Sequence, residues 1–187
     1  MGKMKPLRNY LLASLLAALL ACPATQAATR PVISQSEVAF APDPAALQLV
    51  LKAIQSARRS IHVAAYVFTS KPVAQALLAA QHAGIEVAVV ADRKENSGRY
   101  SATRFLADQQ LPVRLNARYA IFHHKFMIID AMHVQTGSFN YSAAAAGKNA
   151  ENVLVVWNAP ELAARYEQQW QRLWQEADTL ADATRSD

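Results

Sequence analysis

Cysteine is almost absent from this 187-residue chain, because Cys22, near the N-terminus, is its only one. Residues 28–187 contain no thiol, so a mature chain that begins there has no disulfide bonds and no thiolate metal sites. The five histidines form no H-E-x-x-H pattern, which argues against a zinc site built from histidine. We therefore expect neither a metal ion nor a cofactor.

Acidic side chains are absent from the first ten residues, which carry the basic residues Lys3, Lys5 and Arg8. An apolar run of eleven residues follows at 11–21, too short to span a membrane. A small-x-small sequence at 25–27 completes the pattern of a secretory signal peptide. We predict that residues 1–27 are removed after Ala27 and that the mature protein is periplasmic or secreted.

The leader also has a second interpretation. Leu19-Leu-Ala-Cys22 resembles a lipobox, and lipidation of Cys22 would leave the mature chain as a membrane-anchored lipoprotein. The small-residue cleavage site after Cys22 favours the signal peptidase route. Either way, residues 28–187 are expected to form one domain, because about 160 residues can bury an adequate core.

Net charge is small once the leader is set aside. Three of the nineteen basic residues lie in the first ten positions, which leaves 16 basic and 14 acidic residues in the remainder. The remaining charge is unevenly placed, since residues 93–125 hold seven basic and two acidic side chains. This segment suits a polyanionic partner such as nucleic acid, and Tyr100 and Tyr119 within it could stack on bases. A solvated loop and helix with no partner is the alternative.

The most informative pattern lies in residues 123–140. Its first half, H-x-K-x4-D, consists of His123, Lys125 and Asp130, and its second half, G-S-x-N, consists of Gly137, Ser138 and Asn140.

These residue types suit attack on a phosphodiester. The imidazole of His123 is a good nucleophile near neutral pH and could form a phosphohistidine. Lys125 would project from the same face of a strand, because positions i and i+2 point the same way, and would neutralise phosphate oxygens. Gly137 permits close backbone approach, while Ser138 and Asn140 offer donors to the same oxygens.

The pattern resembles the HKD signature of the phospholipase D superfamily, and within it the small bacterial endonuclease Nuc subgroup. The likeness continues through residues 137–142 and 148–152 and covers about residues 36–175. The resemblance implies that His123 is the nucleophile and that Lys125, Ser138 and Asn140 bind phosphate.

Two acidic residues have different expected roles. The resemblance implies that Glu151 orients the nucleophilic imidazole by its other nitrogen, as the acid of a catalytic triad does. Asp130 is the D of the HKD motif, but it lies at the far end of the expected strand. We predict a structural role for Asp130, either pairing with a basic residue or capping a turn.

The chain has one motif, and this raises a chemical problem. The leaving alkoxide needs a proton, and His123 cannot be nucleophile and general acid in the same step. No other histidine is followed two positions later by lysine. We therefore predict a twofold homodimer that brings two His123 side chains to one shared active site, which is also the arrangement that the Nuc resemblance implies.

Alternating strand and helix patterns predict an α/β fold, a layered mixed sheet flanked by helices, with one HKD motif per chain. The expected strands are 37–41, 61–68, 85–91, 113–115, 125–130, 133–136 and 152–157. The expected helices are 44–57, 70–83, 102–110 and 160–179, and residues 93–101 are expected to form a polar loop.

Three functions fit these features. The first is a secreted, metal-independent endonuclease that cleaves DNA, with RNA as a further candidate, through a covalent phosphohistidine. The second is a phospholipase D that hydrolyses phosphatidyl head groups, since the chemistry at phosphorus is the same. The third is a non-catalytic nucleic-acid-binding protein, which the complete set of motif residues disfavours. The short chain and the basic segment favour the nuclease, and no stable membrane span is expected.

Overall fold

The structure, a computed structural model, describes residues 1–2, 34–98 and 100–180. Residues 3–27 of the expected signal peptide, Cys22 among them, lie outside the described residues. Every helix and strand described here belongs to the compact unit of residues 32–187.

Eight strands form one mixed sheet in the order β1-β7-β6-β5-β2-β3-β4-β8. Strands β2, β3 and β4 are parallel to one another, whereas the other neighbouring pairs are antiparallel. The strands are β1 (Gln35–Ala41), β2 (Ser60–Ala65), β3 (Glu86–Asp92), β4 (Val113–Asn116), β5 (Lys125–Ile129), β6 (His133–Gly137), β7 (Glu151–Trp157) and β8 (Asp178–Thr179).

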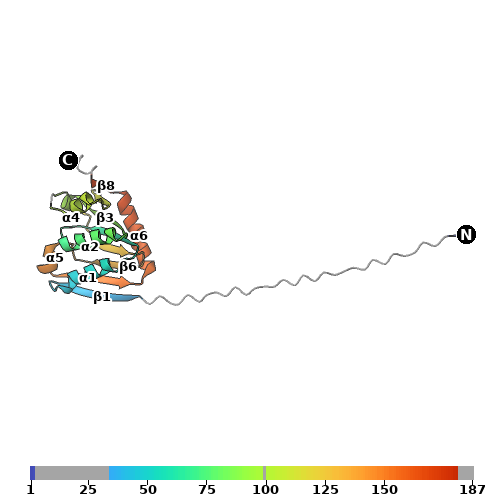
Figure 1. Cartoon of the computed structure of the whole chain (residues 1–187), viewed down its shortest axis with the longest axis horizontal. Coiled ribbons are helices and arrows are strands. Elements are labelled where there is room, and N and C mark those ends of the chain that lie inside the picture. Colours follow the sequence, from blue (N-terminus) through green and yellow to red (C-terminus); the bar gives the residue numbers. More distant parts are fainter. Residues whose placement is uncertain (3–33, 99, 181–187) are drawn as a thin grey trace. The chain divides into compact units, whose positions relative to one another are not determined.

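Helices cover the sheet (Figure 1) and confirm the expected α/β class. They are α1 (Ala45–Gln55), α2 (Lys71–His82), α3 (Arg93–Asn96), α4 (Ala102–Asp108), α5 (Ala143–Gly147) and α6 (Pro160–Gln175). Among the described residues, no helix is both long and apolar enough to cross a membrane.

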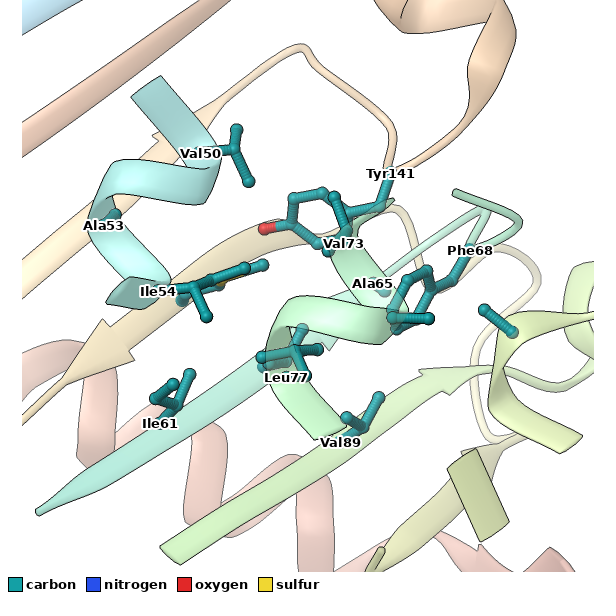
Figure 2. Packing of buried hydrophobic residues seen from close by; sticks show 14 of the residues in the cluster. Val50, Ala53, Ile54, Ile61, Ala65, Phe68, Val73, Leu77, Val89 and Tyr141 are labelled. Carbon is teal, nitrogen blue, oxygen red and sulfur yellow. The ribbon is translucent and has the colours of Figure 1, made fainter. Parts of the chain in front are cut away.

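The two faces of the sheet bury separate apolar clusters. On one face, side chains of α1 and α2 gather with Ile61, Val89 and Tyr141 (Figure 2). On the other face, Trp170 and Leu173 of α6 pack against the opposite sides of the same strands. The central strand β5 is buried along its whole length, which explains its continuous apolar run.

Three boundaries differ from expectation. The strand expected over 61–68 ends at Ala65, so the residues from Tyr66 onward leave the sheet. The expected polar loop at 93–101 contains the short helix α3, because the Asp92 carboxylate caps it by accepting from the Glu95 amide at 2.9 Å. The closing helix ends at Gln175, and β8 then pairs with β4.

Candidate active site

The motif histidine and lysine lie where the chain enters β5. Lys125 is the first residue of that strand and is only 7% exposed, while His123 lies just before the strand and is exposed. The strand expected over 125–130 begins at Lys125 as predicted, and His123 lies two residues before it. The Lys125 ammonium donates a hydrogen bond to the main-chain oxygen of His123 at 3.0 Å. This bond holds the ammonium against the main chain of His123.

Tyr66 contacts both residues, and the sequence analysis missed it. Its ring centroid is 4.6 Å from that of the His123 imidazole, with 55° between the two planes. The Lys125 ammonium lies 5.0 Å from the centre of the same ring. The Tyr66 hydroxyl donates to Glu95 at 3.4 Å, and burial followed by the charge of Glu95 raises the pKa of Tyr66.

Ser138 and Glu151 form a second group across the ends of β6 and β7. The Ser138 hydroxyl donates to Glu151 Oε2 at 2.6 Å, and the Asn149 amide donates to Glu151 Oε1 at 2.9 Å. The Ser138 oxygen in turn accepts from the main-chain amide of Asn152 at 3.0 Å. Within the described residues no hydrogen bond joins Glu151 to His123, so the orienting role of Glu151 stays a prediction.

Gly137 makes this group possible. Its φ of +150° is strained for other residues, and a β-carbon there would overlap the main-chain oxygen of Asn152. Glycine therefore lets β6 approach β7 closely enough for Ser138 to reach Glu151. The sequence suggested a close approach at Gly137 without identifying the neighbouring strand as what comes close.

The two groups interact electrostatically. Burial lowers the pKa of the Lys125 ammonium, and the negative charge of Glu151 partly offsets that effect. Glu151 therefore favours the charged form of Lys125, which is the form that its predicted role as a phosphate ligand requires.

Asn140 lies just beyond β6 on the loop that leads to α5. Its Oδ1 atom is buried and has no hydrogen-bond partner among the described residues. Within the same residues, no hydrogen bond links the Asn140 side chain to the groups around His123 or Glu151. Its assignment as a phosphate ligand stays a prediction.

Asp130 lies at the opposite end of β5, about 16 Å from Lys125 at the usual strand rise. Its carboxylate accepts from the main-chain amides of Arg58, Arg59 and Ser60 at 2.9, 2.7 and 3.0 Å. Burial alone would raise the pKa of Asp130, but these hydrogen bonds and the charge of Arg59 together lower it. Asp130 thus ties the start of β2 to the β5–β6 turn and does not contact the His123 region.

An open cleft of about 430 Å³ borders His123. Its lining includes His123, Lys125 and Gly137 from the motif and Arg165 and Tyr166 from α6. An exposed imidazole beside a buried ammonium in an open cleft can attack an anionic phosphorus centre and hold its oxygens.

Two further side chains, His62 and Tyr119, lie outside this cleft. His62 hydrogen-bonds Glu167 at 2.8 Å and stacks on Trp170 with ring centroids 4.1 Å apart. Within the part of the chain that the structure describes, no three histidine, cysteine or acidic side chains are grouped so that they could hold a metal ion. The Tyr119 hydroxyl donates to Glu176 at 2.7 Å, which anchors that side chain to the end of α6.

Comparisons with known proteins agree with this chemistry. Residues 50–174 match the family described as cardiolipin synthase, PLD-like domain. A phospholipase D from Rickettsia bellii is 36% identical over 140 residues, which cover 74% of this chain and 69% of the relative. A mitochondrial cardiolipin hydrolase from Xenopus tropicalis is 29% identical over 181 residues, covering 95% of this chain and 81% of the relative.

Solved structures show the same relationship. Nuc from Salmonella typhimurium, a phospholipase D family member, matches with a TM-score of 0.77 and 39% identity over 79% of this chain and 98% of Nuc. NucT from Helicobacter pylori matches with a TM-score of 0.71 and 25% identity over 79% of this chain and 99% of NucT. The chain therefore belongs to the phospholipase D superfamily and is a phosphodiesterase.

Proposed function

We propose that this phosphodiesterase is an exported endonuclease that hydrolyses DNA, with RNA as a second substrate, without a metal ion. The observation that carries the proposal is the placement of His123, exposed in an open cleft with the buried Lys125 ammonium bonded to its main-chain oxygen. An internal phosphate of a long strand has nucleotides on both sides, so it can reach His123 only in a cleft that is open to solvent.

The reaction proceeds in two displacements at phosphorus. The His123 imidazole nitrogen attacks, a P–N bond forms, and the P–O bond to one strand breaks. A second imidazole protonates the departing alkoxide. That imidazole then removes a proton from water, which attacks phosphorus and breaks the P–N bond, so that His123 is released. Lys125 neutralises the non-bridging oxygens throughout, which is the charge that metal ions supply in two-metal nucleases.

The second imidazole is proposed to be His123 of a second copy. Val38 and Phe40 of the edge strand β1 are 59% and 61% exposed. Ala39 and Ala41 pack toward α1, so strand alternation directs Val38 and Phe40 to the α6 face, the face of the cleft-lining residues Arg165 and Tyr166. A twofold partner on this face would cover both exposed side chains and bring its own His123 toward the cleft.

The choice of DNA over lipid rests on charge along the same edge of the sheet. Beyond Tyr66 and Glu95, a cavity of about 340 Å³ at the ends of β3 and β4 is lined by Arg93 and Lys94 among others. Cationic side chains extending away from the reacting centre favour a polyanion longer than one head group. Phosphatidyl hydrolysis is the second candidate, because relatives named phospholipase D and cardiolipin hydrolase match most of this chain.

A parallel assay tests the proposal. Plasmid DNA, a single-stranded oligonucleotide, RNA and phosphatidylcholine vesicles should be incubated with the protein in excess EDTA. We expect cleavage of nucleic acid and little release of choline, with His123→Asn as the inactive control. Choline release without DNA cleavage would show that the protein is a phospholipase D and not a nuclease. Loss of activity in EDTA that magnesium restores would refute the metal-independent mechanism.

Mixing experiments test the shared site. If each site needs two histidines, heterodimers of wild type and His123→Ala should be nearly inactive. After subunit exchange in an equal mixture, about a quarter of the dimers are wild type, so the mixture should show about a quarter of the activity of the same total amount of wild-type protein. Retention of about half, or a fully active monomer in sedimentation, would show that each chain holds a complete site.

Export has its own test. The N-terminus of protein recovered from the periplasm or medium should be Ala28 if signal peptidase acts after Ala27. A lipid-modified Cys22 at the N-terminus, lost in Cys22→Ser, would establish the lipoprotein route instead.

A further inference from the structure

A separate cavity of about 310 Å³ lies between the first turns of α2 and α4. Two exposed aromatic rings form one wall, since Tyr100 is 83% exposed and Phe105 is 43% exposed. Polar side chains line the opposite wall, among them Thr69, Lys71 and Gln75. Aromatic surface on one side and a cation on the other is the combination that single-stranded nucleic acid binds.

This cavity is joined to the active-site edge by main-chain contacts. The amides of Thr69 and Ser70 donate to the main-chain oxygen of Tyr141 at 2.9 and 2.8 Å, and Tyr141 directly follows the motif residue Asn140. Tyr66, which packs on His123, precedes Thr69 by three residues. The Cα atoms of Tyr66 and Thr69 can be at most about 11 Å apart. At a rise of about 3.4 Å per nucleotide, the rim of the cavity therefore lies about three nucleotides from the ring that packs on His123.

We propose that this cavity binds one unstacked nucleobase of the substrate strand near the scissile phosphate. The proposal rests on the nuclease function above and deepens it. Tyr100 and Phe105 would contact the base, and Lys71 would meet the adjoining phosphate. Because a base must leave its stack to enter, the cavity favours single-stranded or locally opened DNA over an intact duplex.

The first test compares substrates in one variant. The double variant Tyr100→Ala/Phe105→Ala should lower kcat/KM for a single-stranded oligonucleotide relative to kcat/KM for bis(p-nitrophenyl) phosphate. The ratio should fall roughly fivefold to a hundredfold, the effect of losing one base–aromatic stack. Met132→Ala is the control, because Met132 is 37% exposed in the β5–β6 turn, at the end of β5 opposite Lys125, and lines none of the three cavities described above.

The second test locates the base. A series of oligonucleotides, each with one abasic position at a different distance from the cleavage site, should be cleaved by the wild type and both variants. In the wild type and in Met132→Ala, one or two adjacent abasic positions should lower the cleavage rate. In the double variant that position dependence should vanish.

The outcomes separate the two proposals. If the wild type cleaves the small phosphodiester but no oligonucleotide, the nuclease function fails. If oligonucleotides are cleaved but the double variant keeps the wild-type ratio and abasic pattern, the base pocket fails while the nuclease stands. If the double variant loses activity only on phosphatidylcholine vesicles, the cavity takes part of a lipid and the proposal is overturned.

Discussion

Replacing Gly137 with alanine perturbs the candidate site through one added carbon. The backbone at Gly137 has φ +150°, a conformation that alanine adopts only with strain. The new β-carbon would overlap the main-chain oxygen of Asn152 and lie 3.0 Å from both the carbonyl carbon and Oδ1 of that residue. Most of these atoms belong to the backbone, so relief requires β6 and β7 to separate. Separation would pull Ser138 away from Glu151, which it now reaches at 2.6 Å.

The magnitude follows from two contributions. A non-glycine residue held in a sparsely populated region costs about 1–3 kcal/mol. Forcing backbone to move around extra volume costs about 1–3 kcal/mol more. We therefore expect Gly137→Ala to lower the free energy of unfolding by on the order of 4 kcal/mol, a large share of typical domain stability. For a domain of this size the melting temperature should fall by about 8–16 °C.

The assay is thermal unfolding followed by circular dichroism, with phosphodiesterase activity measured well below the melting temperature. Displacement of Ser138 and Glu151 should also disturb the site, and a loss of about 1.4 kcal/mol of transition-state stabilisation lowers the rate tenfold. We therefore expect activity to fall at least about tenfold even where the variant is folded. Gly147→Ala is the control, since an added β-carbon there meets nothing within 4 Å. If Gly137→Ala melts within a few degrees of wild type and stays fully active, the role assigned to this glycine is wrong.

Three further changes test other parts of the account. Asp130→Ala should destabilise the fold by on the order of 3 kcal/mol in chemical denaturation, because three partly buried main-chain amides lose their acceptor. The pKa of Asp130 is lowered in the folded wild type. The difference in stability between wild type and Asp130→Ala is therefore full above pH 3.8 and shrinks as the pH falls below that value. Glu151→Gln should lower the pKa of Lys125 further, since Glu151 now raises it; an unmoved lysine titration in NMR would refute the coupling. Tyr66→Ala should lower kcat roughly tenfold, because the His123 ring and the Lys125 ammonium lose the aromatic ring that they pack against. Tyr66→Phe keeps the ring and should keep most of the activity. Equal losses in the two variants would show that the ring does not position these residues.

The sequence predicted the fold well where burial alone decides the structure. The apolar run at 126–129 is fully buried as β5, and the alternation of strand and helix patterns led to the correct class. Ends of elements were predicted less well, because they depend on local caps and distant partners. No glycine or proline marks the end of α6 at Gln175, and the cap that Asp92 gives α3 is short-range and easily missed.

Residues of the site were predictable when they shared a motif and missed when they met only in space. Lys125 and His123 are two positions apart in the chain, so strand geometry suggested their proximity. Tyr66 meets both only because β2 pairs with β5, with Ala65 opposite Lys125 across sixty residues of sequence. The Ser138–Glu151 hydrogen bond likewise depends on how β6 and β7 are paired, and Gly137 was the one sequence signal of their close approach.

The covalent role of His123 is the central claim, and trapping its intermediate tests it most directly. An end-labelled oligonucleotide should be turned over in EDTA and quenched in alkaline denaturant, which preserves a histidine P–N bond. Mass spectrometry of the digested protein should find nucleotide on the peptide that contains His123, and none in His123→Asn. Label on another residue, or rapid turnover of wild type with no labelled peptide at any time point, would contradict the mechanism.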